Sequence, residues 1–202
     1  ASARKGHAGV KGTPAETYQG ILVHDHETTF YKYGSDHQEC LAHILRYLKD
    51  SMENEKNLTW STKMHSFIQE IIHYRNSQEP GMVIDEAVIK KIEERYTDIL
   101  KIAKDEYEYE PPTKYYMDGY NLYKRMEKYM SNHLLFLYNP NVPTTNNEAE
   151  RLLRAYKRKQ AQAVSFRSPD SIDYLCRCIS MLFEMRKNSE KNIFQELSNI
   201  FA

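Results

Sequence analysis

Apolar residues recur every three or four positions over most of the chain, which is the spacing of helices with one buried face. Three such runs follow one another, at residues 60–72, 83–103 and 120–137. The second run ends before Pro111 and Pro112, which cannot continue a helix. Two more helices are predicted at residues 146–160 and 172–187, and a short amphipathic tail lies around residues 193–200. The pattern therefore predicts a mostly helical protein.

A different pattern occupies the first quarter of the chain. Residues 20–25 form a short apolar run that ends in Asp25, which is typical of a buried strand whose last residue emerges at the edge of a sheet. A turn through Tyr33 and Gly34 follows, and residues 37–41 predict a second brief strand. A helix is expected at residues 42–52, while residues 1–19 hold no periodic pattern and predict a flexible lead-in.

The charge balance adds a distinction between segments. The chain has 202 residues, enough for one large or two small domains, and its 28 basic and 28 acidic residues cancel. Neutrality counts mildly against a DNA-binding protein, but the charges are segregated along the chain. Residues 151–167 contain no acid, whereas residues 93–110 are rich in acids. We therefore expect one basic and one acidic surface.

The cysteines and the chain start indicate the cellular compartment and whether the chain is a fragment. Cys40, Cys176 and Cys178 are too few and too unevenly spaced for a disulfide framework, which favours a reducing cytoplasm. No apolar run reaches membrane-spanning length and no secretory leader is evident. The polar start at Ala1 does not resemble a natural initiation, so we expect a fragment of a longer protein.

The predicted helix from residue 146 combines acid and base. Thr145 is a suitable N-cap, and Glu148 three residues later completes a capping box. Glu150 is expected at the margin of the buried stripe, near Arg154 and Lys157, where it could meet both a metal ion and a phosphate. The alternative is a surface ion pair between Glu150 and Arg154. The expected buried stripe consists of Ala149, Leu152, Leu153 and Tyr156, with Arg151 and Arg158 on the opposite side.

The motif at the start of this helix resembles a known family. Val142-Pro143, Asn146-Asn147, Ala149-Glu150-Arg151 and the later Phe166-Arg167-Ser168 are similar to the corresponding segment of the IS66 insertion-sequence transposases. The resemblance implies that Glu150 is the final acid of a catalytic triad of two Asp and one Glu. One departure is Thr145, which replaces the usual Asp of the family. Both residues cap helices, but a role of that Asp in metal or DNA binding is thereby in question.

The first predicted strand carries a second point of resemblance. Residues 20–26 are similar to the strand that delivers the family's second catalytic Asp, which implies this role for Asp25. The pattern Cys40-x-Ala42-His43-x-x-Arg46 also matches. By residue pattern alone, Asp25 could equally begin a turn. His37, Cys40 and His43 have the residue types of a zinc site, but no fourth ligand is evident nearby.

The resemblance implies an α/β fold that is predominantly helical, with an incomplete RNase H-like catalytic core interrupted by a long all-α insertion. It divides the chain into a lead-in (1–19), the first part of the core (20–57), the helical insertion (58–138) and the closing helices with Glu150 (139–202). It further implies two divalent ions, Mg²⁺ or Mn²⁺, held at Asp25 and Glu150.

The implied partner is double-stranded DNA, both transposon ends and target, bound by a homo-oligomer in the bacterial cytoplasm without a membrane. The expected phosphate contacts are Arg151, Arg154, Lys157, Lys159 and Arg167.

The family's first Asp has no counterpart before the first strand, because residues 1–19 contain no Asp. We therefore expect a transposase fragment that cannot cleave DNA by itself. Two non-catalytic functions remain open alternatives: a DNA-binding remnant that uses only the basic helix, and a helical protein-interaction module.

Overall fold

The computed structural model describes residues 6–162, 168–187 and 192–201. The chain divides into two compact units, one formed by residues 11–146 and the other by residues 1–10 with 147–202. Within the described ranges, no helix combines the length and the apolar character that crossing a bilayer requires. The predicted mixture of much helix and little strand is confirmed.

The larger unit contains one small sheet. β1 (Ile21–His24) pairs in parallel with β2 (Asp36–Glu39), and the register places Ile21 opposite Asp36 and His24 opposite Glu39. Both strands predicted from the sequence are therefore confirmed. Because the strands are parallel, their carboxyl ends meet at one edge of the sheet, and the next residues along the chain are Asp25 and Cys40.

The connection between the strands is short and tightly turned. It contains a 3₁₀ helix, η1 (Thr28–Lys32), whose start is capped because the Glu27 side chain accepts a hydrogen bond from the Thr29 amide at 3.4 Å. Gly34 follows with a φ of 75°. A Cβ atom at Gly34 would lie 2.7 Å from the Gly20 carbonyl oxygen, so this return toward β1 requires glycine for both conformation and space.

Five helices follow β2 in the larger unit: α3 (Leu41–Asn54), α4 (Trp60–Asn76), α5 (Glu86–Tyr109), α6 (Asp118–Lys128) and α7 (Met130–Tyr138). Four of them occupy the segment predicted as an all-helical insertion, and α3 is the helix expected after the second strand. The third apolar run is two helices rather than one, because the chain leaves the helical conformation at Tyr129.

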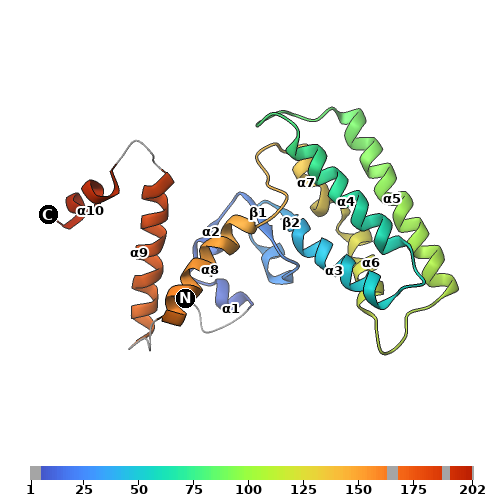
Figure 1. The fold of residues 1–202 in the computed structure, drawn as a ribbon, viewed down its shortest axis with the longest axis horizontal. Coiled ribbons are helices and arrows are strands. Elements are labelled where there is room, and N and C mark those ends of the chain that lie inside the picture. Colours follow the sequence, from blue (N-terminus) through green and yellow to red (C-terminus); the bar gives the residue numbers. More distant parts are fainter. Residues whose placement is uncertain (1–5, 163–167, 188–191, 202) are drawn as a thin grey trace. The chain divides into compact units, whose positions relative to one another are not determined.

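The core of the larger unit lies among these helices. α3 packs against α4 and α6, α4 against α5, and α5 against α6 (Figure 1). Trp60 and Tyr96 are fully buried, and Phe67 is 2% exposed. Removing each such side chain from water contributes roughly 1.5–3 kcal/mol, so this helical core is a main source of the unit's stability. The indole N–H of Trp60 donates to the Tyr107 hydroxyl at 3.2 Å, which satisfies its polar atom.

Polar contacts fix the sheet to the helices. Gln38, in the middle of β2, is fully buried. Its side-chain amide donates to the His133 carbonyl of α7 at 3.1 Å and accepts from the Phe136 amide at 2.9 Å. The Asn132 side chain also donates to the His37 carbonyl at 3.0 Å. β2 is therefore joined to α7 by hydrogen bonds, and breaking either of the two buried bonds of Gln38 would leave an unsatisfied group.

The smaller unit holds α8 (Asn147–Gln162), α9 (Pro169–Lys187) and α10 (Ile193–Phe201), in agreement with the two helices and tail predicted for this part. Two single-turn helices lie in the segment predicted as a flexible lead-in, α1 (His7–Val10) in this unit and α2 (Pro14–Thr17) in the larger one, and its flexibility remains a prediction. The domain boundaries predicted at residues 19, 57 and 138 remain predictions.

Candidate functional site

Asp25 lies where the strand pattern predicted it. It follows the last residue of β1 directly, and its side chain is exposed at the carboxyl edge of the sheet. In parallel sheets this edge is where ligands commonly bind. The Cys40 amide donates to the His24 carbonyl at 2.7 Å and so holds the ends of β1 and β2 together at this edge.

The segment that precedes α8 returns to the same edge. The Leu41 amide donates to the Thr144 carbonyl at 2.9 Å, and the Asn146 amide lies 3.5 Å from the Cys40 sulfur. The side-chain oxygen of Asn146 is buried and has no hydrogen-bond partner among the described residues. Residues far apart in the sequence thus meet beside the strand that ends in Asp25. This brings the beginning of the Asn-Asn motif to that edge.

Glu150 belongs to the smaller unit, in the first turn of α8. Its carboxylate accepts a hydrogen bond from Arg154 at 2.8 Å, with the Glu150 side chain 25% exposed and that of Arg154 71% exposed. The ion pair that the sequence left open as an alternative is therefore present. An exposed pair of this kind is worth little by itself, and the metal-binding role of Glu150 remains a prediction.

The remaining candidate DNA contacts are mostly on the surface of α8. Arg151 and Lys157 are exposed, like Arg154. Lys159 belongs to the backbone of α8 but its side chain lies outside the described residues, as does the whole of Arg167. The exposed part of the predicted basic surface is thus available to a polyanion.

Two expectations for α8 need correction. The helix begins at Asn147, so Asn146 rather than Thr145 precedes its first turn, and Glu148 lies 3.6 Å from the Lys187 ammonium of α9 instead of completing a capping box. The buried stripe is also rotated, because Leu153 is 51% exposed and Ala149 is exposed. Ala155 instead faces α9, where it lines a small apolar hollow with Leu182.

A buried carboxylate lies close behind the Asp25 edge. Glu39, the last residue of β2, is 1% exposed. Its Oε1 atom accepts hydrogen bonds from His26 Nδ1, at 2.8 Å, and from the Tyr31 hydroxyl. Its Oε2 atom faces His133 Nε2 at 3.3 Å and Arg125 Nε at 3.7 Å. Four side chains from the sheet connection and two helices therefore converge on one carboxylate.

The electrostatics of this cluster favour an ionised Glu39. Burial alone would raise the pKa of its carboxyl, but the contacts with His133 and His26 hold the pKa well below its usual range. Burial lowers the pKa of His133, against the opposing effect of Glu39. The guanidinium of Arg125, which retains its proton in proteins, supplies the permanent positive charge beside Oε2.

The sequence pattern did not reveal this cluster. The strand predicted at residues 37–41 says nothing of where the Glu39 side chain lies, and His133 falls within the apolar stripe of a predicted helix. One feature of the sequence pointed to such a cluster: β2 consists of the polar residues Asp-His-Gln-Glu, although the last two are buried. A strand of polar residues inside a helical protein indicates internal hydrogen-bond partners.

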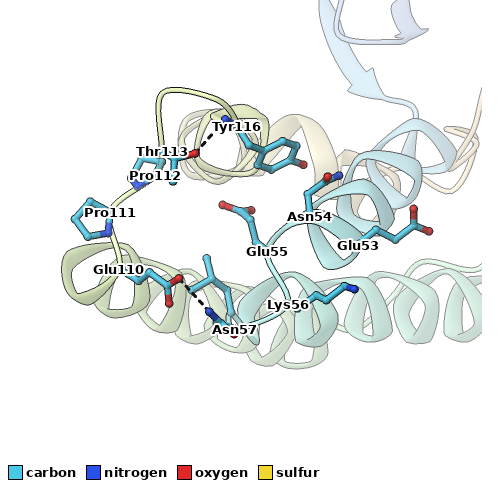
Figure 2. Close-up of a pocket in the computed structure, with 11 residues that line it drawn as sticks. Glu53, Asn54, Glu55, Lys56, Asn57, Glu110, Pro111, Pro112, Thr113 and Tyr116 are labelled. Atoms are coloured by element: carbon cyan, nitrogen blue, oxygen red, sulfur yellow. Dashed lines mark hydrogen bonds between the residues drawn. The ribbon is translucent and has the colours of Figure 1, made fainter.

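A second half-buried carboxylate lies at the opposite end of α3. Glu55 accepts hydrogen bonds from the Ser51 hydroxyl at 2.8 Å and from the Tyr107 hydroxyl at 3.0 Å. It borders a cleft of about 270 Å³ between the ends of α3 and α5 and the loop that contains Tyr116, as Figure 2 shows. Burial raises the pKa of the Glu55 carboxyl. The 14 residues of α3 span about 21 Å, so Glu55 is remote from the Asp25 edge.

The described residues contain no group of three or more His, Cys, Asp and Glu side chains arranged to hold a metal ion. The zinc site considered for His37, Cys40 and His43 therefore finds no support there. His24 and His26 make hydrogen bonds: His24 Nε2 lies 3.1 Å from His37 Nδ1, and His26 bonds Glu39. For a hard divalent cation, the suitable donors at the edge are carboxylate oxygens such as those of Asp25.

These features define a class of protein: a mostly helical polypeptide in which a parallel strand pair is followed by a long helical segment, whose far end returns to the strand edge before a basic helix. The family model described as Transposase IS66 family matches residues 3–173. The chain belongs to this family. The matched segment includes both Asp25 and Glu150. No curated protein and no solved structure matches the chain significantly.

Proposed function

We propose that this chain is part of a transposase that cleaves the DNA ends of an insertion sequence and joins them to target DNA with the help of divalent metal ions. Membership of the IS66 family supports a transposase-related function. The observation that carries the finer proposal is the meeting of Asp25 and the segment 144–146 at one sheet edge. Glu150 follows Asn146 by four residues in the sequence.

In this proposal Asp25 and Glu150 hold the metal ions through their carboxylate oxygens. The chemistry that bound ions would supply is activation of the attacking hydroxyl or water and stabilisation of the leaving oxygen in an in-line phosphoryl displacement. The protein's own contribution is to hold Asp25 at the rigid end of β1 and Glu150 in the first turn of α8. Arg151, Arg154 and Lys157 follow on α8, where they would bind phosphates and orient the duplex without reading its sequence.

The proposed triad needs a further carboxylate. Residues 1–19 contain no Asp, so the residues before β1 do not supply the first acid of the triad. We therefore propose that this chain alone does not cleave DNA. Cleavage is accordingly to be measured with the full-length protein. Assembly of several copies on DNA is part of the same proposal, because two transposon ends must be processed together.

The experiment compares isosteric substitutions in the full-length protein. Asp25→Asn and Glu150→Gln remove one negative charge each and should lower Mg²⁺- or Mn²⁺-dependent cleavage of transposon ends by more than about a thousandfold. Binding of the DNA ends should be retained. Cleavage is measured on labelled duplexes that carry the ends of the element.

Each substitution has a matched control in the chain. Asp36→Asn removes an exposed Asp at the opposite end of the strand pair, and Glu148→Gln removes an exposed Glu from the same turn of α8 as Glu150. Both controls should cleave DNA at the wild-type rate. Wild-type cleavage by the Asp25 and Glu150 variants would contradict the proposal. DNA binding without any metal-dependent cleavage would instead favour the non-catalytic DNA-binding alternative.

A further inference from the structure

The two oxygens of the Glu39 carboxylate contact different parts of the larger unit. Oε1 is bonded to His26, the residue that follows Asp25, and to Tyr31 of the connection between the strands. Oε2 faces Arg125 of α6 and His133 of α7, at 3.7 and 3.3 Å. One buried carboxylate therefore bridges the backbone next to Asp25 and the helical segment.

Aromatic contacts enclose the same bridge. The ring of Tyr129, between α6 and α7, stacks on Tyr31 with centroids 4.9 Å apart and meets the edge of the His26 ring at 5.3 Å. Arg125 is held from the other side, since its guanidinium lies 4.8 Å from the centre of the Tyr47 ring. Ring contacts thus support three of the side chains that face Glu39: His26, Tyr31 and Arg125.

We propose that Glu39 is a positioning residue, which fixes the chain at Asp25 relative to the helices α6 and α7. The helical segment then acts as a support for the catalytic edge and not only as a spacer between Asp25 and Glu150. The catalytic part of this inference rests on the proposed function of Asp25, whereas the structural part concerns only the bridge itself.

The physical argument is the cost of a buried charge. An ionised carboxylate in a protein interior is strongly unfavourable unless charged and hydrogen-bonding partners surround it, and removing one partner leaves the others unpaired. Movement of the Asp25 edge away from the helices would separate His26 and Tyr31 from Glu39, or Glu39 from Arg125 and His133. Either separation breaks interactions in a medium of low polarity, so the edge is restrained.

Glu39→Gln tests the bridge, because it preserves the shape of the side chain but removes the charge and one acceptor. The measurement is amide hydrogen exchange at two reporters: the Cys40 amide, bonded to the His24 carbonyl, and the Glu27 amide, bonded to the Asp25 carbonyl. Exchange at both should accelerate roughly tenfold or more. The Glu110 amide, at the remote end of α5, should keep its wild-type rate after allowance for any change in global stability.

Glu55→Gln is the matched control. Glu55 is a half-buried carboxylate that, like the buried Glu39, is bonded to a tyrosine hydroxyl, but it lies at the other end of α3. It should leave the exchange of the Cys40 and Glu27 amides unchanged. A Glu39→Gln protein whose amides all exchange faster by the same factor would show a merely structural role and overturn the inference, as would unchanged exchange at both reporters.

A milder variant covers the case in which Glu39→Gln does not fold. Tyr31→Phe deletes one hydrogen bond to Glu39 and keeps the ring that stacks on Tyr129. It should accelerate exchange at the two reporter amides by roughly three- to tenfold with little change in melting temperature. Wild-type exchange in this variant would also overturn the inference.

A cleavage assay in the full-length protein separates failure of this inference from failure of the proposed function. If Glu39 positions Asp25, Glu39→Asp should restore part of the activity that Glu39→Gln loses, and the Mg²⁺ concentration for half-maximal cleavage should rise more than the maximal rate falls. Full cleavage by Asp25→Asn would refute the proposed function alone. Abolished cleavage by Asp25→Asn, together with wild-type behaviour of a folded Glu39→Gln protein, would refute the positioning role alone.

Discussion

Two glutamates flank α3 and experience opposite environments. Glu39, just before the helix, is surrounded by His26, His133 and Arg125, and its pKa is held below its usual range. Glu55, just after the helix, has hydroxyl partners and the acidic Glu110 as its charged neighbour, and burial raises its pKa. The same side chain is thus stabilised in its ionised form at one end and disfavoured in that form at the other.

The environment of Glu55 predicts that Glu55→Gln increases thermal stability in a pH-dependent way. A carboxyl whose pKa is higher in the folded than in the unfolded state lowers stability as pH rises from about 4.5, its ordinary value, through the folded pKa. The variant does not undergo this change. Its melting temperature should exceed that of the wild type by ~1–2 °C at pH 7, and the difference should disappear below pH 4.5.

Thermal denaturation followed by circular dichroism at pH 4 and pH 7 measures this effect. Glu53→Gln is the control, since Glu53 is 66% exposed on the same helix and lies 3.9 Å from Lys49. Its effect should be small and similar at both pH values. A Glu55→Gln protein that is less stable than the wild type at pH 7 would contradict the argument, because the hydrogen bonds would then outweigh the cost of burial.

Among single residues, the motifs led to Asp25 and to Glu150 but not to Glu39. An Asp at the end of an apolar run has a position that local sequence predicts. The environment of Glu39 is formed by Arg125 and His133, which are more than eighty residues away in the chain. No local pattern contains that information, so the buried carboxylate emerged only from the fold.

Among the helices, α4 begins with help from a distant element. Thr59 precedes α4 but does not cap it with its own side chain. Instead the Glu106 carboxylate of α5 accepts hydrogen bonds from the amides of Thr59 and Trp60, each at 3.0 Å. A carboxylate at this position satisfies free amides and complements the positive end of the helix dipole. The interaction also fixes α4 and α5 relative to each other.

Glu106→Ala should therefore destabilise the protein by about 1–2 kcal/mol, because the first amides of α4 lose their acceptor. Chemical denaturation with urea measures the change in free energy of unfolding. The control is Glu108→Ala on the same helix, where an exposed Glu lies 3.8 Å from Lys104 and should contribute almost nothing. Equal effects of the two substitutions would show that Glu106 does not act as a cap.

Periodicity predicted most elements because helices and strands need apolar residues at fixed spacing. It failed at residues 120–137, where the apolar spacing continues across Tyr129. The pattern therefore did not reveal that α6 ends there and α7 begins. It also misjudged which side of α8 is covered, because Leu153 is apolar yet 51% exposed.

For the chain as a whole, the neutral charge sum conceals a division between helices. α8 carries only basic charges after Glu150, whereas α5 is rich in acids. A polyanion such as DNA is therefore expected to bind α8. Replacing Arg154 and Lys157 with Ala should weaken DNA binding and reduce the slope of log affinity against log salt by about one for each phosphate that is no longer neutralised.

Fluorescence anisotropy with a labelled duplex at several salt concentrations measures the slope. The control is Lys90→Ala, which removes an exposed cation from α5. It should leave the slope unchanged. An equal reduction of the slope by the α5 and α8 variants would indicate a diffuse charge effect and would count against α8 as the DNA-binding surface.

Local sequence was sufficient to establish the helical character of the chain, the two strands, the position of Asp25 after β1 and the family, because each of these depends on residue spacing or on short motifs. The return of residues 144–146 to the edge beside Asp25, and the link that Glu39 makes from this edge to α6 and α7, became evident only in three dimensions. The Asn146–Cys40 and Arg125–Glu39 interactions each join residues more than eighty positions apart. Such pairings follow from how the whole core packs, which no local window of sequence contains.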